Sequence, residues 1–323
     1  MTEKCRNDCK ILMPSYICES VQNIFPKEKI VFYDLQESFE VEEQLLVSQI
    51  ESGDFDESIF YLMNYFGGLT SQRILKNLRT LCWEHRITVV EDTTHSIFTK
   101  PSTIGDYCIA SLRKWMAVPE GAVIYSKNQL PEEWGKLEHA QASHKIEAMV
   151  LKNLFLGHTG AYLDLKDLDL INRNYRYIFT NEEEQIESRD KLYGISDVSS
   201  FLLACGDVNQ IIAKRKKNYY FLKEMLQDSG IELYPCANMQ ELDGVPFVAL
   251  LLSDNGQRDL LKHNLSEHKI YCAVHWSIKD KAQLDHVNVQ KWTEQLISLP
   301  IDQRYGIEEM EYLAETIISC FRR

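Results

Sequence analysis

Four polar side chains between residues 89 and 126 have types and spacing suited to covalent chemistry. Asp92 follows a short apolar run, and His95 comes three residues later. Ser111 and Lys114 stand just before a second apolar run. A lysine amine with a lowered pKa is a nucleophile that forms Schiff bases with aldehydes. The question is which elements would hold a carboxylate and a lysine so that both act on one ligand.

Asp92 has two interpretations. Aspartate is favoured in turns and at helix N-caps, so a structural role alone explains an aspartate just after a strand. In parallel α/β sheets, however, ligands bind at the carboxyl ends of strands, and Asp92 follows the expected strand 88–91. The second interpretation is therefore a buried anion that faces a cationic ligand atom.

Lys114 also has two interpretations, because most lysines are simply exposed. The residues before it, Ile109 and Ala110, are apolar, and Trp115 and Met116 follow it directly. We expect these neighbours to enclose the lysine and to remove part of its water. Desolvation lowers the pKa of an amine, which favours a nucleophilic role.

Together the residues match the needs of pyridoxal phosphate. Lysine takes the aldehyde, a carboxylate pairs with the pyridinium nitrogen, and a hydroxyl binds the phosphate. Ser111, three residues before Lys114, has the hydroxyl for the last of these contacts.

Alternating strand and helix patterns predict the frame that holds these residues. Such alternation implies a mainly parallel sheet covered by helices. A helix is expected at 70–84, where apolar residues recur at helical spacing. Strands are expected at 10–16, 29–33, 58–65, 88–91, 107–111 and 122–125.

The pattern changes in the last third of the chain. The middle section, 128–194, is predicted to be helical at first and then to form irregular, charged loops near a site. One or two helices are expected at 198–228, strands at 247–252 and 271–274, and helices at 258–268 and 307–323. We predict a large α/β domain at 1–197 and a small α+β domain at 198–323.

The order of short motifs is similar to that of a known family. The chain carries ED-x-x-H, then G-D, then S-x-x-K, then E-G-A-V-I. This order resembles the fold-type I pyridoxal-phosphate enzymes, and in particular the DegT/DnrJ/EryC1/StrS family of sugar aminotransferases. Four further segments agree, and the resemblance covers essentially the whole chain: K-I-L-M-P-S-Y-I-C at 10–18, Y-F-G-G at 65–68, V-H-W at 274–276 and L-P-I-D-Q-R-Y at 299–305.

The resemblance implies a role for each residue. Asp92 would pair with the pyridinium nitrogen and keep the ring protonated. Ser111 would bind phosphate, while Lys114 would hold the cofactor as a Schiff base and then shuttle a proton. His95 falls where the family has Gln or His near the phenolic oxygen of the ring, and its alternative is a structural histidine.

Three other side chains each have two possible roles, one in the site and one in the structure. Arg113 is assigned either to the phosphate or a substrate carboxylate, or to the surface. Tyr16, counted as a cofactor-binding candidate, and Tyr65 either line the cavity or pack in the core. The resemblance also implies a homodimer, a keto-sugar substrate that is nucleotide-linked, and an amino donor such as glutamate.

The N-terminal region departs from the family pattern. Family members carry tens of residues before the strand that here begins near Lys10, including a Gly-Ser/Thr loop that cradles the phosphate. No glycine precedes Gly53 in this chain. We expect the phosphate cup to be incomplete, and three explanations remain open: a late start, a degenerate relative, or a partner chain that supplies the missing half. The loss would weaken cofactor binding, because each charge-assisted hydrogen bond contributes roughly 1.5–3 kcal/mol.

Composition and charge argue against several other classes of protein. A formal net charge of −13 argues against nucleic acid, and the short basic run at 214–217 is typical of a solvated helix face. No apolar run approaches a membrane span, and the N-terminus lacks a secretory signal. The nine cysteines are odd in number and lack zinc spacing, so we expect no metal site and free thiols in the cytoplasm.

Four functions follow from these patterns. The first is an aminotransferase that uses pyridoxal phosphate through Lys114. The second is a truncated or degenerate, non-catalytic homologue that acts as a structural or regulatory partner. A sugar dehydratase on the same scaffold would replace the lysine by histidine, so Lys114 argues against it. An unrelated α/β protein with chance matches is the fourth.

Overall fold

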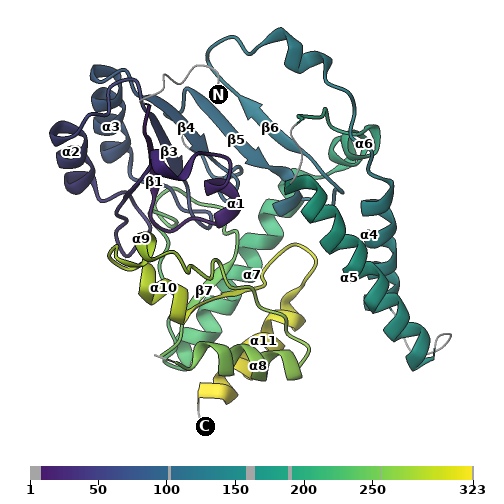
Figure 1. Cartoon of the computed structure of the whole chain (residues 1–323). Helices are drawn as coiled ribbons and strands as arrows, with labels where there is room; N and C mark the ends of the chain where they lie inside the picture. The colour runs from purple at the N-terminus through teal and green to yellow at the C-terminus, as the bar shows by residue number, and fades with distance from the viewer. Residues whose placement is uncertain (1–8, 101–102, 158–163, 188–190, 255, 322–323) are drawn as a thin grey trace. The chain divides into compact units, whose positions relative to one another are not determined.

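A six-stranded sheet forms the frame of the protein (Figure 1). The computed structural model describes residues 9–100, 103–157, 164–187, 191–254 and 256–321. In sheet order the strands are β2 (Ile30–Tyr33), β1 (Ile11–Pro14), β3 (Ile59–Met63), β4 (Thr88–Asp92), β5 (Tyr107–Ser111) and β6 (Ala122–Tyr125). The pairs β1–β2, β1–β3, β3–β4 and β4–β5 are parallel. The predicted mainly parallel sheet is therefore confirmed.

Two of the inner strands, β1 and β3, are apolar along their whole length. All four residues of β1 and all five of β3 are buried. A strand covered on both faces reads as a continuous apolar run rather than an alternating one, as these two sequences do. Helix α3 (Gln72–Glu84) buries Ile74, Leu78 and Leu81 at the expected spacing and packs against α2 (Glu43–Ser52).

The chain divides into two compact units. The first comprises Met1–Ala110, Ile124–Asn128 and Asp207–Arg323, and the second comprises Ser111–Val123 and Gln129–Gly206. The chain therefore passes from one unit to the other within β5 and within β6. The predicted domain boundary after residue 197 stays a prediction.

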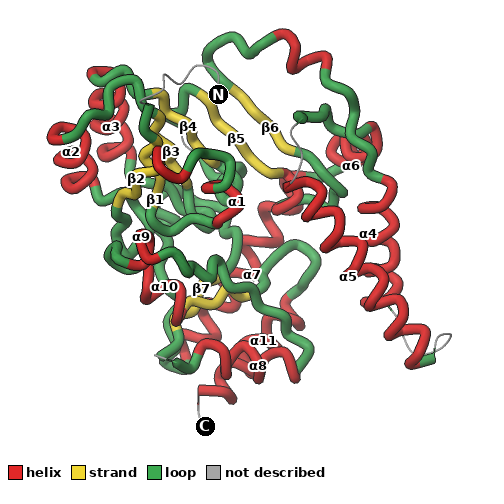
Figure 2. Tube along the Cα trace, viewed as in Figure 1, coloured by secondary structure: helices red, strands yellow, loops and turns green. Residues whose placement is uncertain are grey.

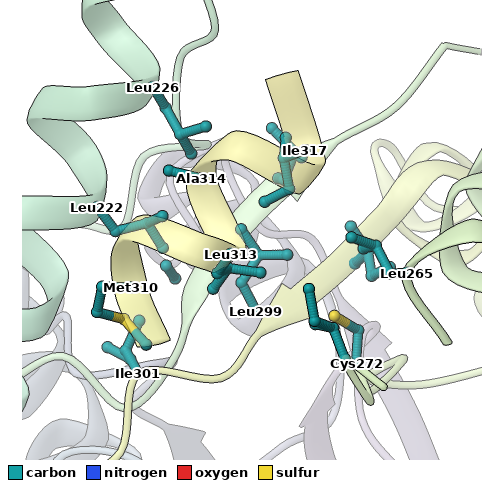
Figure 3. Packing of buried hydrophobic residues seen from close by; sticks show 14 of the residues in the cluster. Leu222, Leu226, Leu265, Cys272, Leu299, Ile301, Met310, Leu313, Ala314 and Ile317 are labelled. Atoms are coloured by element: carbon teal, nitrogen blue, oxygen red, sulfur yellow. The ribbon is translucent and has the colours of Figure 1, made fainter. Parts of the chain in front are cut away.

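The C-terminal part of the first unit has its own apolar core (Figure 3). Strands β7 (Ala249–Leu252) and β8 (Leu296–Leu299) pair antiparallel. Three helices surround them: α7 (Val208–Asp228), α8 (Arg258–Glu267) and α11 (Ile307–Phe321). Where a strand was expected at 271–274, the structure has an isolated bridge between Ala273 and Ser298. The short helices are α1 (Glu19–Gln22), α9 (Lys281–Leu284) and α10 (Val289–Gln295).

The second unit is mainly helical. Figure 2 shows α4 (Ser143–Leu156) and α5 (Leu165–Glu187) as a pair of long helices, and α6 (Asp197–Cys205) follows them. The prediction of irregular loops at the end of 128–194 was wrong. Leu168, Ile171 and Tyr175 recur at helical spacing on the partly or fully buried face of α5, while charged residues fill its outer face.

Two further observations concern the described part of the chain. Within it, no helix is long and apolar enough to cross a bilayer. None of the cysteines described there forms a disulfide, while Cys5 lies outside the described residues.

Candidate functional site

Asp92 is the last residue of β4, at the carboxyl end of a strand inside the sheet. Its side chain is buried, with 7% exposure. Oδ1 accepts a hydrogen bond from the backbone N–H of Thr94 at 2.8 Å, which is the local turn contact typical of aspartate. Oδ2 accepts one from the hydroxyl of Tyr61, on β3, at 2.7 Å.

The donors to Asp92 are both uncharged. Among the residues that the structure describes, no Lys, Arg or His pairs with this carboxylate, although a buried charge without an opposite charge is costly. The site therefore has the electrostatic character needed to bind a cationic atom. The turn role and the ligand role predicted for Asp92 are compatible, because each uses a different lone pair.

Glu91, from the ED motif, and Gly105, from the GD motif, have structural roles. Glu91 is buried and accepts hydrogen bonds from Asn64 and from the amides of Ile104 and Gly105. Burial raises the pKa of Glu91, although these hydrogen bonds oppose the shift. A Cβ at Gly105 would lie 2.8 Å from the Cβ of Glu91, so only glycine allows this close approach. These residues fix the loop between β4 and β5.

His95 lies inside an aromatic cluster. Its ring is 1% exposed and stacks on Phe247, with centroids 4.3 Å apart and an interplanar angle of 14°. Phe66 and Trp276 also stack with it, at 5.2 Å and 6.0 Å. Aromatic packing of this kind accounts for the burial of His95. Its predicted contact with a cofactor oxygen stays a prediction.

Tyr16 belongs to the same cluster. It is fully buried, and its ring lies 5.1 Å from both Trp276 and Trp292, the second of which is also fully buried. The hydroxyl of Tyr65 donates to the backbone carbonyl of Tyr16. Burial raises the pKa of the Tyr16 phenol well above its usual range. These contacts are those of core packing, and the cofactor role of Tyr16 stays a prediction.

Close packing also explains the Gly-Gly pair that follows Tyr65 and Phe66. Gly67 has a φ of +99°, and a Cβ there would collide with the backbone carbonyl of Val245. Glycine is therefore required where this loop meets the C-terminal part of the unit.

Ser111 and Lys114 belong to the second unit. Ser111 ends β5 and is partly exposed, and Lys114 ends a single 3₁₀ turn, Leu112–Lys114. Lys114 is exposed, whereas the next residue, Trp115, is 1% exposed. The expectation that apolar neighbours enclose the lysine was wrong, because successive side chains of a 3₁₀ turn point in different directions and Trp115 takes the buried position.

Arg113, the neighbour of Lys114, has a defined partner within the second unit. Its guanidinium donates to Oε1 of Glu183, on α5, at 2.7 Å. Lys145, on α4, pairs with the same oxygen, and its ammonium lies 4.7 Å from the ring centroid of Phe179. Glu183 therefore ties the turn that carries Lys114 to both long helices. The surface ion pair explains Arg113 without a phosphate contact.

We expect this ion-pair cluster to lose strength in acid. Burial alone would raise the pKa of Glu183, but the hydrogen bonds from Lys145 and Arg113 outweigh it and hold the pKa below its usual range. A group with a lowered folded-state pKa stabilises the fold above its unfolded pKa, about 4.3 for glutamate, and loses this effect as the pH falls through the folded value.

Urea unfolding, followed by circular dichroism, tests this at pH 7 and at pH 3. Glu183→Gln is expected to cost roughly 1 kcal/mol at pH 7, since the cluster is partly exposed, and much less in acid. Its exposed neighbour on α5, Glu184, provides the control as Glu184→Gln. An equal cost for Glu183→Gln at both pH values would contradict the assignment.

Each unit thus carries its own share of the predicted residues. The first unit holds Asp92 at the end of β4 and His95 in the loop that follows, and the second holds Ser111 and Lys114 in and just after β5. Sequence reasoning missed Tyr61 and Glu183. The available signal for Tyr61 was its hydroxyl, the one polar side-chain group in the strand Ile59–Met63, which precedes the ED strand. No signal in the sequence pointed to Glu183.

Comparisons with known proteins give matches among solved structures only. The sequence matches no family model and no curated protein. A DegT/DnrJ/EryC1/StrS aminotransferase from Brucella abortus has a TM-score of 0.63 at 12% identity, over 97% of this chain and 79% of that one. DesV from S. venezuelae, in complex with a ketimine intermediate, has a TM-score of 0.66 at 13% identity, over 99% and 80%.

A third similar structure is a protein from Streptococcus pneumoniae that is designated a sugar aminotransferase, in its PLP form. It has a TM-score of 0.63 at 17% identity, over 97% of this chain and 80% of that one. Identities this low establish the fold alone. The resemblance inferred from the motifs is thus confirmed for the fold, and this chain has the fold-type I architecture of the DegT/DnrJ/EryC1/StrS aminotransferases.

Proposed function

We propose that this protein is a pyridoxal-phosphate-dependent aminotransferase of the DegT/DnrJ/EryC1/StrS family. The fold supports the class, and the motif order supports the family. The observation that carries the proposal is the buried Asp92 carboxylate, which ends β4 and has only uncharged donors among the described residues.

The residues around Asp92 fit the cofactor. The protonated ring nitrogen of pyridoxal phosphate is a cation with one N–H donor. Asp92 can accept that hydrogen bond, since a carboxylate offers about four lone-pair positions and Tyr61 and Thr94 use two of them. About two lone-pair positions therefore remain for a further donor such as the ring N–H.

When bound, the cofactor supplies an electron sink that stabilises negative charge on the substrate carbon. Asp92 would hold the proton on the ring nitrogen. Lys114 would bind the aldehyde carbon through Nζ and then move a proton as a general base and acid. Ser111 would donate its hydroxyl to the phosphate, and His95 is assigned to the phenolic oxygen.

The proposed amino acceptor is a keto-sugar, nucleotide-linked, and the proposed donor is an amino acid such as glutamate. The reaction would serve the synthesis of a polysaccharide or a secondary metabolite. The similar fold of the S. pneumoniae protein supports a sugar. We further propose that the protein is cytoplasmic and forms a homodimer. Light scattering of the purified protein would test the dimer.

Cofactor binding is the test of this function. The purified protein, incubated with pyridoxal phosphate, is expected to develop a visible absorbance band. Borohydride followed by peptide mass spectrometry should then locate one pyridoxyl group on Lys114. A folded protein that shows no band at high cofactor concentration would rule out the enzyme.

A non-catalytic homologue is the second candidate. The exposure of Lys114 and the aromatic packing around His95 favour it, because neither residue needs a ligand to explain its position. The same titration separates the two candidates.

A further inference from the structure

We propose that Tyr61 is a positioning residue, which with the backbone N–H of Thr94 fixes the Asp92 carboxylate for the ring nitrogen of bound pyridoxal phosphate. This inference rests on the proposed function. It adds a residue whose hydroxyl does not itself contact the cofactor and acts only through Asp92.

The sheet places Tyr61 and Asp92 on the same face, as diagonal neighbours on adjacent strands. Strands β3 and β4 are parallel neighbours, with Tyr61 opposite Val90 and Met63 opposite Asp92. Tyr61 is 4% exposed and Asp92 7% exposed, so water competes little for their hydrogen bond. Both side chains lie within the first unit, as does Thr94.

The two donors act on different oxygens of the carboxylate. Tyr61 donates to Oδ2 at 2.7 Å, and the Thr94 amide donates to Oδ1 at 2.8 Å. One donor would leave the carboxylate free to turn about its last bond. Two donors on opposite oxygens fix the carboxylate plane and so direct the remaining lone pairs, which is what preorganisation of a charged contact requires.

A tyrosine is suited to this role because it orients the charge without cancelling it. Burial, together with the charge of Asp92, raises the pKa of Tyr61 well above its usual range, so its hydroxyl remains protonated. A lysine or arginine at this position would form an ion pair and compete with the cationic ring. The neutral phenol leaves the negative charge for the ligand.

A second buried phenol on a neighbouring strand provides a matched control. The hydroxyl of Tyr33, on β2, donates to the backbone carbonyl of Tyr61 at 3.0 Å, and Tyr33 is 1% exposed. Tyr33→Phe and Tyr61→Phe each remove one buried hydroxyl and leave an acceptor without that donor. Only Tyr61→Phe removes a hydrogen-bond donor to Asp92 itself.

The experiment compares two cofactors in calorimetric titrations. Pyridoxal phosphate has the ring nitrogen, and 1-deazapyridoxal phosphate has carbon in its place. The wild type is expected to prefer the natural cofactor, and Asp92→Asn should remove this preference. Tyr61→Phe should reduce the preference by about tenfold, the effect of one hydrogen bond to a charged group, whereas Tyr33→Phe should leave it unchanged. A ratio within each variant cancels any loss of folded protein.

Each failure has a separate meaning. Equal preference in Tyr61→Phe and Tyr33→Phe would overturn the positioning role while the proposed function stands. A wild type that binds both cofactors equally would overturn the pairing of Asp92 with the ring nitrogen, and this inference with it. A wild type that binds neither would overturn the proposed function as well.

Discussion

Lys114→Ala is expected to abolish covalent attachment of pyridoxal phosphate and to lower the rate of amino transfer by about 10²–10⁴-fold, the usual contribution of a positioned general base. The reason is that one amine is proposed to hold the cofactor and to move the proton. We expect alanine to keep the 3₁₀ turn, because the lysine side chain is exposed and its removal beyond Cβ leaves no cavity.

The measurements are peptide mass spectrometry after borohydride treatment and the single-turnover rate with glutamate. Lys76→Ala provides the control, because Lys76 is an exposed lysine on α3, in the first unit. It should retain both attachment and rate. A pyridoxyl group that is found on another lysine in the wild type would show that Lys114 was wrongly assigned.

The second large effect concerns stability rather than chemistry. Leu265→Ala is expected to lower the free energy of unfolding by about 2–5 kcal/mol, the range for a large-to-small change in a packed core. Leu265, on α8, is fully buried in the C-terminal core, which also contains Leu299 and Cys272 (Figure 3). The loss combines transfer of the side chain with the cavity that remains.

The same helix supplies the matched control. Leu260 is 58% exposed, so Leu260→Ala removes the same atoms without opening a cavity. It should change the free energy of unfolding by less than about 0.5 kcal/mol. Urea titration of both variants gives the comparison, and similar losses for the two would contradict the packing described here.

Much of the sheet was predictable because its signal is local. Strands β3, β4 and β5 are short apolar runs bounded by polar or glycine-containing segments, and their order with α3 implied parallel pairing. The position of Asp92 at a strand end followed from the same pattern. Gly67 and Gly105 stand in the Y-F-G-G and G-D motifs of the sequence. The structure gives the reason for them, since a Cβ at either position would collide with another segment.

The remainder depends on contacts that are distant in sequence. Helix α5 was mistaken for loops because its charged outer face hides the apolar spacing of its inner face. Glu183 lies 70 residues from Arg113, and no local pattern connects them. The exposure of Lys114 depended on which side of a single turn Trp115 occupies, and composition cannot decide that.

The two fully buried tryptophans lie in different compact units, and this has a spectroscopic consequence. Trp115 is in the second unit and Trp292 in the first, while Trp83, on α3, is 74% exposed. Buried indoles emit at shorter wavelengths than exposed ones. Each unit therefore has one fully buried tryptophan beside the more exposed Trp83, Trp134 and Trp276. Variants that keep only Trp115 or only Trp292 would show by their fluorescence whether the two units unfold together or separately.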